Sequence, residues 1–159
     1  MNKITVSPSK TLKLTNVLKA ECDIEKEDFN LEVLVNRMHS YIRAKGAMQV
    51  GPLIQYTNAC LDEQGQLKIQ MSMRMQCNTF LYRLESPYSM ESVIRIPNCM
   101  YCRYQGPEEK LKFAYDKLQV EAFEQEIPLK GSSYTIFVDR NEEEETIVAD
   151  VFMEKTDGR

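Results

Sequence analysis

Residues 104–155 combine a helix pattern with two strand patterns, and this order limits the folds that the chain can adopt. Gly106 allows a sharp turn because it lacks a Cβ, and Pro107 suits the first helical position, where its missing N–H needs no partner. The apolar positions that follow have the spacing of one helical face: Leu111, Ala114, Tyr115, Leu118 and Ala122. The segment therefore predicts a turn and then a helix that packs through one face.

Two strand patterns follow this helix. They cover residues 133–139 and 146–154, with Gly131 before the first and an acidic turn at 140–145 between them. The glutamates at 142–145 are typical of a hairpin tip in water. Residues 104–155 thus predict a turn, a helix and a β-hairpin in that order.

The first half of the chain shows a similar order. After a short lead-in over residues 1–11, we expect a strand at 12–22, a helix at 29–44 and strands at 53–59 and 67–76. The last of these alternates, so its apolar residues should face the core: Leu67, Ile69, Met71, Met73 and Met75. A short strand at 80–82 and a longer one at 93–104 lead into the second half.

A shift of 80 residues superimposes the two halves, because it relates Gly51 to Gly131 and Gln70 to Asp150. We predict two tandem βαββ repeats, over about residues 12–76 and 92–155. Neither repeat is large enough to bury a good core alone, so we expect one domain over residues 1–159. The predicted fold class is α+β, with an antiparallel sheet and two helices packed on it.

Composition excludes several classes of function. The formal net charge is −4 and the pI is near 5.2, which argues against nucleic-acid binding as the main role. The chain contains no apolar run of the roughly 18 residues that a membrane span needs, and its N-terminus does not resemble a secretion signal. Its five cysteines are an odd number, which indicates free thiols and a cytoplasmic location.

Asp150 is the most informative single position. On its strand, Val148 and Phe152 lie two residues to either side, so the carboxylate should share a sheet face with apolar neighbours. A partly desolvated carboxylate needs positive charge or hydrogen bonds, and a groove with such walls would suit an apolar molecule that carries a cation. The alternative is that Asp150 faces water or pairs with Arg95 or Arg103 on a neighbouring strand.

The order and spacing of several segments resemble the gyrase-inhibitor-like (GyrI-like) effector-binding domain family. The segments are Ile96-Pro97, residues 104–107, the helix pattern after Leu111, Gly131 with residues 134–137, and the acid-Val-x-Met ending at Asp150. The resemblance implies two βαββ modules around a central groove that binds small, often lipophilic or cationic, effectors. It places the family's acidic ligand contact at Asp150.

The sequence departs from that family in three ways. Asp150 replaces the usual Glu, Glu154 stands where a Pro is common, and the chain has no Trp, so that Phe123 or Tyr115 would fill the space of a helix tryptophan. The family includes sensor parts of transcription regulators and stand-alone proteins. No helix-turn-helix pattern precedes the domain, so we expect this chain not to be a complete DNA-binding regulator.

Other reactive residues give weaker signals. Cys99 and Cys102 form a lone CxxC without a second ligand pair, so we expect no metal or cofactor there. His39 is the single histidine and lies beside a helical apolar stripe, where a surface position is more typical than a catalytic base.

We therefore predict a non-enzymatic small-molecule-binding protein for lipophilic or cationic ligands, with no nucleic-acid or membrane partner. The predicted ligand-binding residues are Asp150, Phe152, Phe137, Tyr101 and Tyr56. A second hypothesis is a protein-interaction module, such as an inhibitor of a larger protein, that keeps the fold without a working pocket. A third and weaker one is a small hydrolase that uses Asp150.

Overall fold

The computed structural model describes residues 3–156, and the chain divides into two compact units. Unit 1 consists of Met1–Leu12 and Arg95–Arg159, and unit 2 of Lys13–Ile94. Strands β1 (Lys3–Cys22) and β4 (Tyr88–Pro107) each contribute residues to both units. In chain order, each unit then holds a helix followed by a hairpin.

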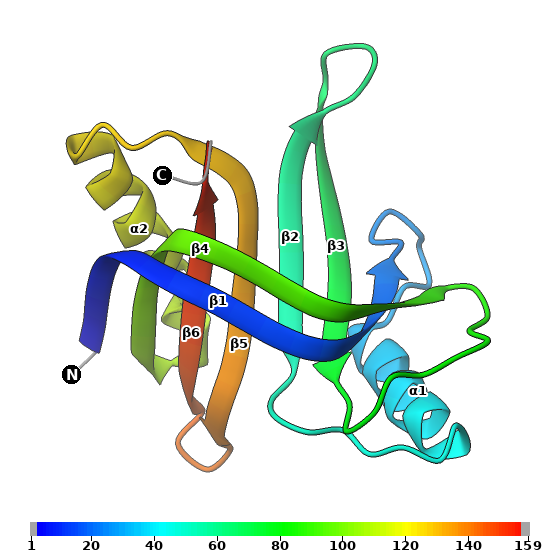
Figure 1. The fold of residues 1–159 in the computed structure, drawn as a ribbon. Coiled ribbons are helices and arrows are strands. Elements are labelled where there is room, and N and C mark those ends of the chain that lie inside the picture. The colour runs from blue at the N-terminus through cyan, green and yellow to red at the C-terminus, as the bar shows by residue number, and fades with distance from the viewer. Residues whose placement is uncertain (1–2, 157–159) are drawn as a thin grey trace. The chain divides into compact units, whose positions relative to one another are not determined.

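Unit 2 contains α1 (Leu31–Ala44), β2 (Ile54–Leu61) and β3 (Leu67–Gln76) (Figure 1). Strand β3 pairs antiparallel with β2 on one side and with the second half of β1 on the other. Asp62 shapes the hairpin turn, because its carboxylate accepts hydrogen bonds from the backbone N–H groups of Gln64 and Gln66.

Helix α1 packs on this sheet through its buried residues Met38 and Ile42. Asn30 caps the N-terminus, because its side chain accepts a hydrogen bond from the Val33 N–H at 3.1 Å. Gly46 follows the C-terminus with a φ of +77°, a left-handed conformation that glycine adopts without a steric penalty. The apolar core of unit 2 lies between this helix and the strands.

Unit 1 contains η1 (Glu108–Lys110), α2 (Lys112–Glu124), β5 (Leu129–Asn141) and β6 (Thr146–Lys155). Strand β6 pairs antiparallel with β4 and with β5, and α2 lies against one face of this sheet (Figure 1). The helix buries small and aliphatic residues, Ala114, Leu118 and Ala122, against a core that includes Cys102, Tyr104, Ala149 and Val151.

The predicted fold class is confirmed: the described residues form an α+β structure with antiparallel strands and two α-helices. The prediction of Pro107 at the first helical position was wrong. Pro107 is the last residue of β4, with an extended ψ of 135°, and the 3-10 turn η1 separates it from α2. The proline is instead the last residue of the strand, and it has no N–H group that could donate a hydrogen bond to an adjacent strand.

The prediction of a lead-in over residues 1–11 was also wrong, because β1 begins at Lys3. Ile4 and Val6 pack against the core of unit 1, so alternation of apolar residues starts earlier than expected. The short strand predicted at 80–82 is absent, and those residues have no regular secondary structure. Leu81 is buried there as part of a connection rather than a strand.

Strand β3 departs from its predicted burial along its length. Met73 and Met75 are buried as expected, whereas Leu67 and Ile69 are 69% and 52% exposed. A strand of 10 residues is about 33 Å long at about 3.3 Å per residue, and a helix of 14 residues is about 21 Å long. The α1 helix is thus too short to cover the hairpin end of the strand.

None of the helices among residues 3–156 is both long and apolar enough to cross a membrane.

Candidate functional site

The candidate site lies on the face of the unit 1 sheet opposite α2. Side chains alternate along β6, so Ala149 and Val151 point into the core while Asp150 and Phe152 point to the other face. Strand register places Arg103 of β4 beside Asp150.

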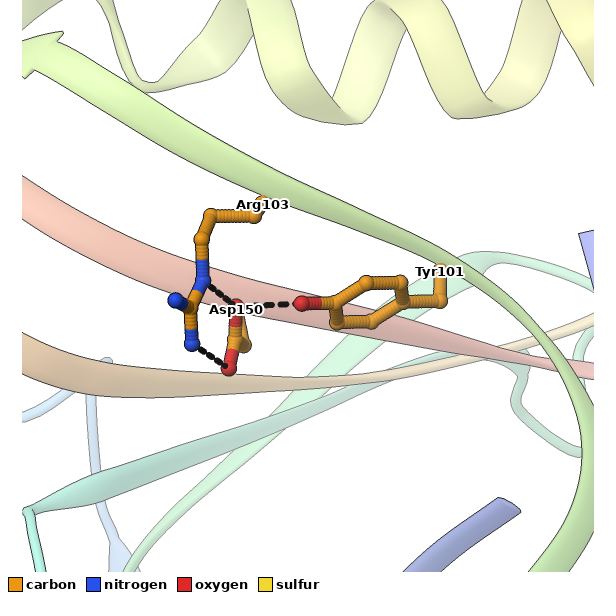
Figure 2. Close-up of polar contacts among 3 residues, drawn as sticks. All are labelled: Tyr101, Arg103 and Asp150. Carbon is orange, nitrogen blue, oxygen red and sulfur yellow. Dashed lines mark hydrogen bonds and ion pairs between the residues drawn. The ribbon is translucent and has the colours of Figure 1, made fainter. Parts of the chain in front are cut away.

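Asp150 accepts three hydrogen bonds (Figure 2). Arg103 donates from Nε to Oδ1 at 2.8 Å and from Nη2 to Oδ2 at 2.9 Å, and the Tyr101 hydroxyl donates to Oδ1 at 2.7 Å. The guanidinium therefore binds the carboxylate edge-on through two N–H groups, the geometry that gives the strongest pairs of this kind. Of the alternatives left open by the sequence, pairing with Arg103 is the one that the structure contains.

The electrostatics keep Asp150 ionised. Burial alone would raise the pKa of this carboxyl group, but the hydrogen bonds from Arg103 and Tyr101 and the charges of Arg103 and Lys10 outweigh that effect and lower it. Burial, together with the hydrogen bond to Asp150, raises the pKa of Tyr101 to about 12, so its phenol stays a donor. The carboxylate side chain is 14% exposed, whereas that of Arg103 is 43% exposed.

Two aromatic rings lie next to the carboxylate. Tyr101 and Phe152 are register partners, their ring centroids are 4.9 Å apart, and they are 8% and 6% exposed. The Lys10 ammonium lies 4.0 Å from the centroid of the Tyr101 ring, which is cation–π geometry. A pair of buried rings, one of which already contacts a cation, thus adjoins an ionised carboxylate.

The predicted ligand-binding residues are only partly brought together. Asp150, Tyr101 and Phe152 are neighbours on one face. Phe137 lies on the opposite face, where it is the register partner of Ala149 and packs against the core under α2. Tyr56 belongs to unit 2, where the Arg74 guanidinium carbon lies 4.1 Å from its ring centroid.

Two further residues of this face were not predicted from the sequence. Tyr134 on β5 is the register partner of Phe152 and is 5% exposed. The alternation of β5 could have identified it, since it shares its parity with Ile136, the register partner of Asp150. No sequence signal pointed to Lys10, because its strand was not predicted.

A hollow with a volume of about 440 Å³ lies further along β4 and β6, beyond the Arg103–Asp150 pair. Gln105 and Val148, which are register partners, line it, and they lie two residues from Arg103 and Asp150 respectively. The remaining lining residues come from the ends of β4, β5 and β6: Gly106, Pro107, Asp139, Arg140, Asn141, Thr146 and Ile147. Asp150 is not itself among the lining residues, so the hollow and the carboxylate are neighbouring features of the same strands.

Both cysteines of the CxxC are buried within unit 1. The thiol of Cys99 donates to the Ile96 carbonyl and that of Cys102 to the Ala114 carbonyl. Burial raises their pKa values to about 11 and about 12, respectively. These thiols are therefore protonated at neutral pH and act as hydrogen-bond donors within unit 1.

Neither a family model nor a curated protein matches this sequence. Solved structures do match its fold. The crystal structure of the EcmrR C-terminal domain has a TM-score of 0.61 at 13% identity and covers 98% of this chain and 96% of its own. The EcmrR chain in a cryo-EM complex with DNA has a TM-score of 0.69 at 14% identity over 97% of this chain.

The chain has a GyrI-like fold. The fold predicted from the family resemblance is thereby confirmed, and at these identities the likeness shows the fold alone. This chain spans 57% of the EcmrR chain in the DNA complex. A further GyrI-like match, SAV2435 bound to tetraphenylphosphonium, has a TM-score of 0.44 at 10% identity, which is too low to extend its ligand to this chain.

Proposed function

We propose that this GyrI-like protein binds small cationic organic molecules without transforming them, with Asp150 as the charge contact. The observation that carries the proposal is the ionised, 14% exposed carboxylate beside two aromatic rings and next to a hollow. A buried carboxylate attracts a cation more strongly than an exposed one, because water screens it less. The shared fold with the EcmrR C-terminal domain is consistent with an effector-binding role.

The body of the ligand would lie in the hollow at Gln105 and Val148, with its cation directed toward Asp150. Tyr101 and Phe152 would form the apolar backing of the carboxylate, because their rings are buried beside it. Phe137 and Tyr56 are not part of this proposed contact set, because they lie on another face and in another unit.

A thermal-shift screen with cationic amphiphiles, including tetraphenylphosphonium and benzamidine, tests the proposal. A ligand at about 100 times its dissociation constant stabilises a fold by about 2.7 kcal/mol. We expect stabilisation of the wild type that is lost in Asp150→Asn. Asp116→Asn makes the same change on the exposed side of α2 and should respond as the wild type does. Equal stabilisation of all three proteins would refute a role for Asp150.

The exposed side of α2 favours a second candidate function, that of a protein-interaction module. Phe113, Val120 and Phe123 are 46%, 54% and 84% exposed and lie opposite the buried face of the helix. Such a stripe is typical of a surface that meets a partner. Affinity capture with the wild type and with Val120→Lys tests this role, which requires a partner that the wild type retains and the variant loses.

A further inference from the structure

The Asp150 carboxylate is arranged for one kind of cation. Its two oxygens accept parallel N–H bonds of 2.8 and 2.9 Å from Arg103, and the Tyr101 hydroxyl occupies a further position on Oδ1. The guanidinium and the carboxylate share a two-point edge, as Figure 2 shows. A cation that replaces Arg103 must therefore offer two N–H donors with the same spacing, or leave an acceptor of a 14% exposed group without a donor.

We propose that the site selects planar amidinium or guanidinium ligands, and that Arg103 is a tethered occupant which such a ligand displaces. This inference rests on the proposed function and specifies its ligand class. Quaternary ammonium and phosphonium ions have no N–H group, so they cannot form either of the two hydrogen bonds that Arg103 donates to Asp150. An amidinium regains both and keeps the Tyr101 hydrogen bond in place.

The Arg103 side chain can release Asp150 and move into water, because it is already partly exposed. Its side chain is 43% exposed, so its guanidinium reaches water on a long and flexible stem when it releases the carboxylate. Asp150 stays in place because it belongs to the middle strand of the β4–β6–β5 sheet. The exchange is therefore a side-chain movement of Arg103 that leaves the carboxylate where it is.

The position of the hollow determines how a bound ligand would be oriented. It begins at Gln105 and Val148, one alternation step beyond the Arg103–Asp150 pair. A ligand with an amidinium at one end and a flat aromatic or short alkyl body fits this path, with the charged end at Asp150. Benzamidine is the simplest probe of this class, and tetraphenylphosphonium is the contrasting cation without N–H groups.

Isothermal titration of both probes into the wild type, Arg103→Met and Arg103→Met/Asp150→Asn tests the inference. Methionine keeps an apolar stem and removes the competing guanidinium. We expect benzamidine to bind Arg103→Met about tenfold more tightly or better than the wild type, since bonds to charged groups carry at least that much. The double variant should lose this gain. Arg43→Met, on the exposed side of α1, should match the wild type.

A second readout follows Arg103 itself. In the wild type, the Arg103 Nε–H resonance, assigned by its loss in Arg103→Met, should shift as benzamidine saturates the protein. If Arg103→Met does not fold, Arg103→Lys replaces the fork with a single ammonium and should still bind benzamidine more tightly than the wild type.

The outcomes distinguish a failure of this inference from a failure of the proposed function. If Asp150-dependent binding occurs but Arg103→Met binds benzamidine no more tightly than the wild type, Arg103 is not a competitor and the inference fails alone. A preference of Arg103→Met for tetraphenylphosphonium over benzamidine also overturns it. If neither probe nor any other cation of the screen binds any variant in a manner that depends on Asp150, the proposed function itself fails.

Discussion

Arg103 and Asp150 face each other as register partners on β4 and β6, and each oxygen of the carboxylate accepts an N–H from the same guanidinium. The pair lowers the pKa of Asp150 below its ordinary value of 3.8. A lowered carboxyl pKa in the folded state contributes stability above the pKa of the unfolded chain, and this contribution is lost as pH falls through the folded-state pKa.

We therefore expect Asp150→Asn to lower the free energy of unfolding by roughly 1 kcal/mol at pH 7, a modest loss because water screens the 43% exposed Arg103. The difference from wild type should persist down to about pH 5 and shrink below about pH 4. Urea unfolding across this pH range measures it. A difference that grows toward acid pH would contradict the assignment. Asp116→Asn serves as the control and should stay within about 0.5 kcal/mol of the wild type.

Burial along β3 predicts unequal effects of two substitutions on the same face. Met73 is 1% exposed and packs with α1, so Met73→Ala should lower the free energy of unfolding by about 2–5 kcal/mol. Ile69 is 52% exposed, so Ile69→Ala should cost much less, about 1 kcal/mol or below. Chemical denaturation of both variants decides the point. Similar losses would mean that the hairpin end of β3 is covered in solution.

Helix α2 offers a second matched pair. Leu118 is fully buried against the unit 1 sheet, and Leu118→Ala should destabilise the protein by about 2–5 kcal/mol. The substitution Phe123→Ala removes a larger side chain. Because Phe123 is 84% exposed, this substitution should alter the free energy of unfolding by only about 0.5 kcal/mol. Differential scanning calorimetry compares the two. A large loss for Phe123→Ala would show that this ring is packed in solution.

The cysteines should differ in their reactivity at pH 8. Cys60 is half-buried on β2, whereas Cys77, Cys99 and Cys102 are buried. Burial raises the pKa of Cys102 to about 12, and only the thiolate reacts with iodoacetamide. We expect peptide mapping after brief alkylation to find Cys60 modified before the three buried thiols. In urea, where the protein is unfolded, all four thiols should react at equal rates. Equal alkylation rates in the native protein would contradict the burial of Cys77, Cys99 and Cys102.

Local patterns predicted the helices and the face of β6 that carries Asp150, because apolar periodicity reports which side of an element is covered. They did not predict which arginine would meet Asp150. That choice depends on the register between β4 and β6, which pair in space although 38 residues lie between Pro107 and Thr146 in the sequence. Arg95 lies outside the residues of β4 that pair with β6.

The face of β5 that Phe137 occupies could not be predicted from the sequence either. It was predicted as a wall of the site, yet its register partner is Ala149 and it faces the helix. A register irregularity lies directly after it, between Phe137 and Asp139, so that the pairing of β5 changes within the strand. Aromatic character alone does not reveal which face a residue occupies. Tyr134, two residues before Ile136, is the aromatic residue of β5 that shares a face with Asp150.

The division of the chain has a consequence for its synthesis. Unit 2 is one continuous segment, Lys13–Ile94, whereas unit 1 needs both Met1–Leu12 and Arg95–Arg159. A ribosome that adds about 5–20 residues per second needs roughly 3–13 s to make the 65 residues of Arg95–Arg159. During that interval unit 2 is complete, while Ile4 and Val6 have been made but the core against which they pack has not. The earlier segment of unit 1 must therefore wait for the later one, which includes Asp150, before unit 1 can form.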